Sequence, residues 1–201
     1  MPIRRHVLLL PLLAAACANR EEPSAPLGPI GYRFLTPLPL NVAALEIREG
    51  GPPPVPGDIG ASLSPSPAEA VRIMARDRLS AVGTEGRAVF TVTRAALTRG
   101  PGDAMLCVVG CRLEILAETG ARLGFVEAEA RASVSGADAT RPQAAGRLLR
   151  RAMDQLNVEF EFQLRRNLRD WLVTVPPGTP GSAGVPAPPA GGVTVEELPR
   201  S

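Results

Sequence analysis

Two cysteines four positions apart, Cys107 and Cys111 in the stretch CVVGC, have the residue type for a disulfide or for thiolate ligation of a metal. The surrounding alternation predicts a single strand, in which residues four apart share a face and lie about 13 Å apart. Bridged cysteines have Cα atoms within about 7 Å, so a disulfide would need a sharp bend at Gly110. Two thiolates are also too few ligands for a metal site. We expect two buried free thiols, with an intramolecular disulfide as the alternative.

Side chains for acid–base catalysis are scarce. The single histidine, His6, lies in an N-terminal stretch that we expect to be removed, which leaves no imidazole for a catalytic triad or a metal. Glu127 and Glu129 have the spacing of a carboxylate pair, but alternation on a solvated strand face explains that spacing more simply. The sequence has no Gly-x-Ser-x-Gly elbow, no phosphate-binding glycine loop and no dinucleotide fingerprint. We therefore expect a protein that is not an enzyme, with no catalytic residue, metal or cofactor.

A third cysteine, Cys17, ends an apolar N-terminal stretch. Arg4 and Arg5 precede an apolar run over residues 7–13 and three alanines over residues 14–16, which is the pattern of a secretory signal. The apolar run is too short for a transmembrane helix, which needs about 20 apolar residues. Residues 1–16 are therefore predicted to be a signal peptide.

The sequence Ala14-Ala15-Ala16-Cys17 resembles the lipobox of bacterial lipoproteins, departing from it at Ala14, where leucine is commoner. The resemblance implies that the signal is removed before Cys17 and that this cysteine carries acyl chains. Each buried methylene contributes about 0.8 kcal/mol, so several chains hold a protein on a membrane. Ala18 stands where lipoproteins of the inner membrane often have Asp, which implies an outer-membrane lipoprotein facing the periplasm, with the inner membrane as the alternative. An ordinary secretory signal with an incidental cysteine is a further alternative.

The composition, 45% apolar over 201 residues, fits one modest domain between two polar ends. Proline-rich residues 17–36 are predicted to be a lipidated tether, residues 37–175 the domain, and residues 176–201 a disordered tail. Within the tail, residues 193–198 are either a short peptide ligand or plain tail. Loss of Arg4 and Arg5 leaves 20 arginines against 20 acidic residues, and the arginines are interleaved with glutamates. We therefore expect no nucleic-acid partner.

The first half of the domain is predicted to be a strand followed by a helix. Residues 41–49 alternate, with Ala43, Leu45 and Ile47 on one face. Residues 66–83 begin with a capping box, Ser66 to Glu69, and end at a glycine. The helix has an apolar stripe and an opposite face, with Arg72, Arg76 and Asp77, that we expect in water. The stripe consists of Val71, Met74, Ala75, Leu79 and Val82.

Three strands are predicted next. Residues 86–98 pair through a turn with a strand that starts near Met105, and a second turn at Thr119 and Gly120 leads to the last strand. An antiparallel register there satisfies both faces: Arg112 lies opposite Glu127, and the apolar pairs are Leu113 with Val126, Cys111 with Ala128 and Val109 with Ala130. The small inward residues Ala128, Ala130 and Ala132 leave room for a helix to lie close to the sheet.

That helix is predicted over residues 140–173, with Thr140 and Gln143 as its capping box. Its apolar stripe consists of Ala145, Leu148, Leu149, Ala152, Leu156, Phe160, Leu164, Leu168, Trp171 and Leu172. About 30 residues make a helix of roughly 45 Å, longer than a strand of about 10 residues at about 33 Å, so one end is expected to overhang the sheet. Met153, Val158 and Phe162 lie off the stripe and are predicted to contact a partner; a curved helix that covers only its own sheet is the alternative.

The predicted fold is α+β, with the order β-α-β-β-β-α and a four-stranded antiparallel sheet packed on two helices. Element order resembles lipopolysaccharide-assembly lipoproteins and auxiliary lipoproteins of lipid-trafficking ABC transporters. The stretches PLNVAALEI, PAEAVRIMARDRL and LNVEFEFQLRRNL resemble an uncharacterised group of Gram-negative envelope lipoproteins over most of residues 37–173. The resemblance implies a membrane-anchored, non-enzymatic accessory or assembly subunit of an envelope complex such as a transporter, with an envelope protein as partner. The alternative is a periplasmic module that holds a lipid or apolar ligand between the long helix and the alanine-lined sheet.

Overall fold

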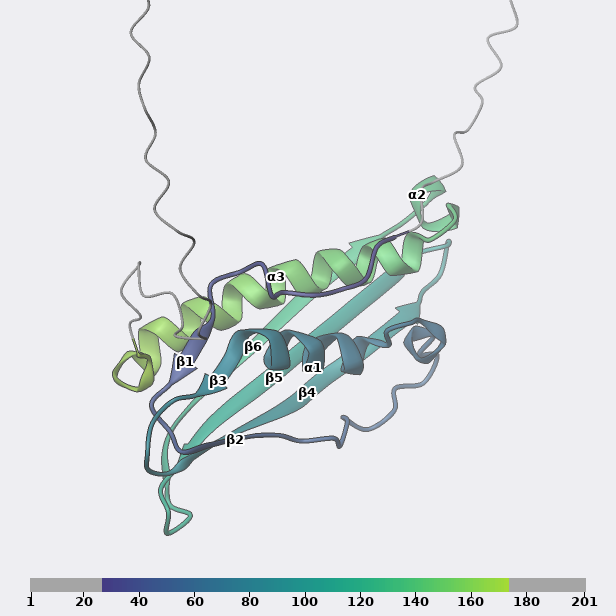
Figure 1. Cartoon of the computed structure of the whole chain (residues 1–201). Helices are drawn as coiled ribbons and strands as arrows, with labels where there is room; N and C mark the ends of the chain where they lie inside the picture. The colour runs from purple at the N-terminus through teal and green to yellow at the C-terminus, as the bar shows by residue number, and fades with distance from the viewer. Residues whose placement is uncertain (1–26, 174–201) are drawn as a thin grey trace, which may run out of the picture.

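The computed structural model describes residues 27–173, in which a layer of helices lies across one face of a twisted four-stranded sheet (Figure 1). The sheet has four strands, as predicted, in the order β2-β4-β5-β6, and the two longer helices cover it. The predicted signal peptide, Cys17 and residues 176–201 lie outside the described residues. The main elements are β2 (Ala44–Ile47), α1 (Pro67–Arg78), β4 (Arg87–Arg99), β5 (Met105–Leu116), β6 (Arg122–Val134) and α3 (Ala144–Asn167).

The expectation of a wholly antiparallel sheet is wrong at β2. This strand pairs in parallel with β4, Ala44 opposite Arg87 and Ile47 opposite Phe90, while β4, β5 and β6 pair antiparallel. Strands β2 and β4 are joined through α1, and a helical crossover returns the chain in the same direction. The strand is also shorter than residues 41–49, although Leu45 and Ile47 are half-buried against the core as predicted.

A second, two-stranded sheet was not predicted. It pairs β1 (Leu38–Leu40) in parallel with β3 (Leu79–Ala81). Helix α1 therefore ends at Arg78, five residues before the predicted end, because the backbone that follows bonds to β1. Gly83 serves this approach of two chain segments, since a Cβ there would lie 2.6 Å from the nitrogen of Val42. Val82, predicted for the apolar stripe, is exposed.

One of the two hydrogen bonds of the capping box predicted at the start of α1 is present. The Ser66 hydroxyl accepts a hydrogen bond from the Glu69 amide at 3.3 Å, and Pro67 is the first helical residue. The Glu69 carboxylate turns instead to two arginines of the same helix. The remaining stripe residues, Val71, Met74, Ala75 and Leu79, are buried as predicted.

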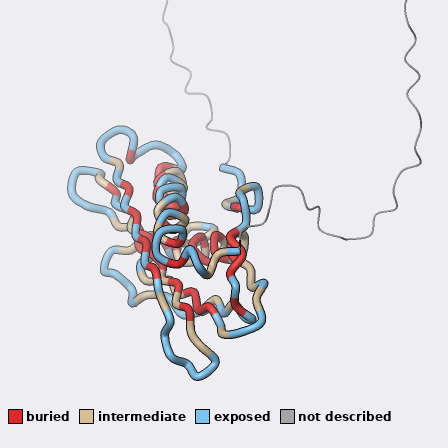
Figure 2. Tube along the Cα trace, turned by 90° about the vertical axis from the view of Figure 1, so that its left-hand side faces the viewer, coloured by how far each residue is buried: buried red, intermediate tan, exposed pale blue. Residues whose placement is uncertain are grey.

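The register of the β5–β6 hairpin is confirmed in every predicted pair, including Arg112 opposite Glu127. Their side chains form an ion pair of 2.6 Å on the face away from the helices. On the other face the three alanines of β6 are buried beneath α3. Figure 2 shows the same division along the whole chain, with buried residues gathered between the helices and the sheet and the loops exposed.

Helix α3 has 24 residues and differs from the prediction at both ends. Thr140 belongs to the separate short helix α2 (Ala137–Thr140), where its hydroxyl donates to the carbonyl of Ala137, and Gln143 takes a left-handed conformation with φ 63°. The chain leaves α3 at Leu168 through the 3-10 turn η2 (Arg169–Trp171) and bonds to β1. At about 1.5 Å per residue α3 is roughly 36 Å long, and the 13-residue strands β4 and β6 are roughly 43 Å long, so α3 lacks the excess length from which an overhang was predicted. Another 3-10 turn, η1 (Gly60–Ser62), precedes α1.

Residues 27–36, called the leading segment below, pack between α1 and α3, although they were predicted to be part of the tether. Leu27 lies so close to Gly146 of α3 that a Cβ there would come within 2.8 Å of its Cδ1. Tyr32 is 4% exposed, and its amide donates to the Asp77 carboxylate at 2.8 Å. The folded domain therefore includes ten residues that were predicted to belong to the tether.

Candidate interaction surface

Two apolar side chains project from the outer side of α3, one helical turn apart. Val158 is 68% exposed and Phe162 is 52% exposed, and the guanidinium of Arg166 lies 6.0 Å from the centre of the Phe162 ring. We call these three residues the α3 patch. An apolar pair at helical spacing beside a cation has no group for bond-making chemistry, but it is a suitable contact for another protein.

Met153, predicted to contact a partner together with Val158 and Phe162, is fully buried, so that part of the prediction is wrong. Helix α3 contacts both the sheet and α1. Its buried arc is therefore wider than the single stripe read from the sequence, and it takes in Met153 and Asn157 on the side toward α1. Periodicity alone gives the centre of a buried arc and leaves its width open.

A buried arginine fixes α3 against α1. Arg78, whose side chain is 1% exposed, donates to the side chains of Asn157 and Glu161, each at 2.5 Å, and to the carbonyl of Thr36 at 3.1 Å. A buried charge is tolerated when hydrogen-bonding partners surround it. These bonds join α1, α3 and the leading segment, so the α3 patch is presented by an element held on two sides.

The pKa of the Glu161 carboxyl reflects this contact. Burial alone would raise it, but hydrogen bonds from Arg78 and Arg165 outweigh burial and hold the pKa below its usual value. The burial of Arg78 was not predicted, because an arginine at a helix end is ordinarily exposed. The available signal was its position, four residues after Met74 and seven after Val71, both of which are buried.

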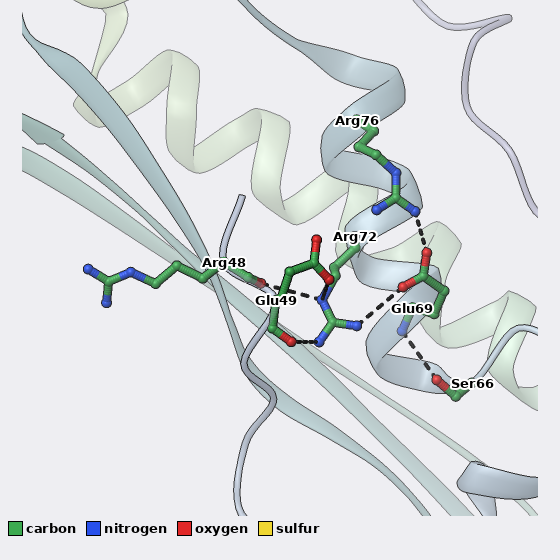
Figure 3. A network of polar contacts seen from close by, with 6 residues as sticks. All are labelled: Arg48, Glu49, Ser66, Glu69, Arg72 and Arg76. Carbon is green, nitrogen blue, oxygen red and sulfur yellow. Dashed lines mark hydrogen bonds and ion pairs between the residues drawn. The ribbon is translucent and has the colours of Figure 1, made fainter. Parts of the chain in front are cut away.

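A second arginine network ties the chain that follows β2 to α1 (Figure 3). Arg72 donates to the carbonyls of Arg48 and Glu49 at 3.4 and 2.5 Å and to the Glu69 carboxylate at 3.2 Å. Arg76 also pairs with Glu69, and its hydrogen bond is the main reason why the pKa of that carboxyl is lowered. Arg72 was expected in water and is instead mostly buried. The charged groups of this network are paired with one another, so the network has a structural role: it holds the chain after β2 against α1.

The expectation that Asp77 faces water is also wrong. Its side chain is 8% exposed and accepts hydrogen bonds from the amide of Tyr32 and from Nε of Arg33. The carboxylate therefore fixes the leading segment to α1.

Cys107 and Cys111 are free and buried on the helix-facing side of β5, opposite Ala132 and Ala128. The pairing of β5 with β6 runs without interruption through Gly110, so the strand lacks the sharp bend that a disulfide would need. Burial, assisted by the Asp58 carboxylate, raises the pKa of the Cys107 thiol to about 12. Burial raises the pKa of Cys111 as well, so both thiols are protonated at neutral pH and pack as small apolar groups.

The two glutamates considered as an acid–base pair lie on the open face of the sheet, each beside an arginine. Glu127 pairs with Arg112, and Glu129 pairs with Arg131 at 2.7 Å and with Arg94 at 3.7 Å. Within residues 27–173, no group of three or more histidine, cysteine, aspartate or glutamate side chains has the arrangement of a metal site. No helix in that same range is long and apolar enough to cross a membrane.

The space considered for an apolar ligand, between α3 and the alanines of β6, is occupied by protein. Side chains from both sides of this interface are buried in one continuous core. On the helix side they include Leu148, Leu149, Ala152, Leu156 and Phe160, and on the sheet side Ala128, Ala130 and Ala132. The Phe160 ring meets Phe90 of β4 edge to face, with ring centres 5.8 Å apart. This is the packing of an interior, and it gives the ligand-binding alternative no support.

Comparison with known proteins gives limited similarity. No family model matches the sequence, and no curated protein matches it. Among solved structures, the chain is similar to protein XCC0632 of Xanthomonas campestris, which belongs to the family model DUF330, with a TM-score of 0.42 and 13% identity over 68% of this chain and 93% of that one. For a minor lipoprotein of Acinetobacter baumannii the TM-score is 0.35 and the sequence identity is 19%, over 65% of this chain and 96% of that one. For lipoprotein GNA1162 of Neisseria meningitidis the TM-score is 0.28 and the sequence identity is 12%, over 56% of this chain and 96% of that one.

Lipoproteins of Gram-negative bacteria are therefore among the solved structures that this chain resembles. Likeness of this degree identifies neither the family nor the function of the chain. The resemblance in element order to lipopolysaccharide-assembly lipoproteins stays a prediction.

Proposed function

We propose that this protein is a membrane-anchored lipoprotein and a non-enzymatic accessory or assembly subunit of an envelope complex. Acyl chains on Cys17 hold it on the outer membrane, with the domain in the periplasm. The lipobox-like sequence before Cys17 supports the anchor. The observation that carries the docking role is the exposure of Val158 and Phe162 on a helix fixed by the buried Arg78 network.

The α3 patch supports docking on energetic grounds. Complete burial of a valine or phenylalanine side chain contributes about 1.5–3 kcal/mol, and apolar anchors at helical spacing fit an apolar groove in a partner. Arg166, beside the Phe162 ring, stands at the end of the patch and favours a partner groove with an acidic rim. Because α3 is held on two sides, little ordering is needed when it binds.

The charged side chains support a non-enzymatic role. The glutamates on the open sheet face and those of both arginine networks are engaged by guanidinium groups. Such groups stabilise the fold, and their arrangement provides no acid and base facing a common cavity.

The docking role is tested by photo-crosslinking in intact cells. A photoreactive amino acid replaces Val158, and the control replaces Glu127 on the opposite side of the domain. We expect one defined protein adduct from the Val158 position, and its loss when Phe162→Ser is added. Equal products from both positions, or none from Val158, would contradict the docking role.

The anchor is tested separately by the intact mass of protein extracted from its native membrane. A chain that begins at an acylated Cys17 is expected. A mass without acyl chains would leave a secreted periplasmic protein and remove the membrane-anchored part of the proposal.

A further inference from the structure

A shallow hollow of about 710 Å³ lies between the leading segment and α1. Its lining includes Pro29, Ile30, Arg33 and Phe34 from the segment and Ile73 and Arg76 from the helix. Phe34 is 81% exposed, more than any other large hydrophobic side chain of the described residues. We call this feature the Phe34 hollow.

The Phe34 hollow lies close along the chain to the predicted anchor. Nine residues separate Cys17 from Leu27, and the ten steps along the chain span at most about 35 Å when fully extended. The leading segment itself is fixed, since Leu27 lies against Gly146 and the amide of Tyr32 bonds to Asp77. A lipid on Cys17 therefore keeps the helix layer near the bilayer, and the hollow begins at Pro29, two residues after Leu27.

The side chains of the hollow have the chemistry of a membrane interface. Phe34, Ile30 and Ile73 provide apolar surface beside two arginines. The side chain of Arg33 is 90% exposed and bonds to Asp77 only through Nε, so its terminal nitrogens have no other partner among residues 27–173. Apolar and aromatic side chains enter the boundary between headgroups and acyl chains by about 5–10 Å, while arginine reaches phosphate oxygens at the surface.

We propose that the Phe34 hollow rests on the lipid surface that holds Cys17, with Phe34 inserted into the interface and Arg33 on lipid phosphates. The inference rests on the proposed anchor at Cys17. It assigns an orientation: the leading segment and the part of α1 that lines the hollow meet the membrane, and the open face of the sheet points into the periplasm.

The test supplies the anchor chemically, so that its result is independent of natural acylation. The mature chain, residues 17–201, is coupled through the Cys17 thiol to a maleimide lipid in vesicles of phosphatidylethanolamine and phosphatidylglycerol. Cys107 and Cys111 are buried, which directs coupling to Cys17. In a Trp171→Phe background, one variant carries Phe34→Trp, and the matched control carries Phe125→Trp on the open face of the sheet. The fluorescence of each is measured with and without brominated lipid.

We expect the Phe34→Trp emission to shift to shorter wavelength on coupling and to be quenched by brominated lipid, while the Phe125→Trp emission changes little. Equal quenching of the two variants, or none for Phe34→Trp, would overturn the orientation. A protein occupant is the third outcome: Phe34→Trp is then unquenched, and a photoreactive group at position 34 gives a protein adduct in cells. If intact mass shows no acyl chain while Phe34→Trp is quenched, the proposed anchor fails and the lipid affinity of the hollow stands.

Discussion

The two faces of the four-stranded sheet come from the same strands but differ in the side chains that they carry and in what covers them. The helix-facing side is apolar and closely packed, with Phe90 against Phe160. The open side bears paired arginines and glutamates, and its exposed Phe125 lies between the guanidinium groups of Arg112 and Arg122, at 5.2 and 4.9 Å. The open face thus carries ion pairs beside its exposed apolar side chains, Leu106 and Phe125, whereas the helix layer exposes Phe34, Val158 and Phe162, each more exposed than those two. The difference supports the proposal above that a partner and the membrane meet the helix layer.

The largest difference in stability is expected between alanine substitutions of one phenylalanine on each face of the sheet. Phe90→Ala should lower the free energy of unfolding by about 3–5 kcal/mol, because it leaves a cavity in the core. Phe125→Ala removes a half-exposed ring with a cation–π contribution of about 0.5–1 kcal/mol and should cost far less. Urea denaturation of both variants measures the difference. Similar losses would mean that the open face is also a core.

A smaller effect is expected when a leucine is added to neighbouring positions of β6. Ala132→Leu places extra volume beneath the helix layer and should cost about 1–3 kcal/mol of stability. Ser133→Leu, on the open face, should change stability by no more than about 0.5 kcal/mol. Thermal unfolding of the pair tests how closely α3 lies on the alanines, and a stable Ala132→Leu protein would show that this interface has spare room.

The pH dependence of stability should distinguish a glutamate of the helix layer from one of the open face. Because the pKa of Glu161 is lowered in the folded state, its contribution is fully present above its ordinary value of 4.5 and is lost as pH falls through the folded value. Glu161→Gln should therefore cost about 1–2 kcal/mol at pH 7 and flatten the decline of stability below pH ~4.5. The matched variant Glu127→Gln loses an exposed ion pair and should cost under about 1 kcal/mol. An unchanged acid limb in Glu161→Gln would remove that residue from the network.

The smallest effect is expected for the two buried thiols. Treatment of the native protein with a thiol reagent should leave its stability unchanged, because the reagent does not reach them. With the pKa of Cys107 near 12, maleimide at pH 7 should not label Cys107 or Cys111 in the native protein. Val108→Cys, on the open face between them, should be labelled readily. In urea, without reductant, both native thiols should become reactive, and failure to detect them by mass would indicate a disulfide.

Local patterns correctly predicted much of the fold. The alternation of β5 and β6 gave the register, since only one pairing matches Leu113 with Val126 and Arg112 with Glu127 at once. The Ser66 cap likewise marked the start of α1. In the candidate surface, the sequence placed Val158, Phe162 and Met153 off the helical stripe, and the first two are exposed whereas Met153 is buried. The Phe34 hollow was not found, because its residues come from two elements far apart in the sequence.

The sequence by itself determined which residues face the core on β2, β5 and β6 and most of those on α1 and α3, because these periods are set by backbone geometry within a few residues. Only the tertiary structure decided the parallel direction of β2, the strand β3 that ends α1, and the burial of Arg78 and Met153. These features depend on segments 40 to 80 residues apart, such as Thr36 and Asn157 on either side of Arg78. A local sequence pattern contains no information about such distant neighbours. An arginine such as Arg78, which the pattern assigns to solvent, can therefore be buried in the fold and link two helices.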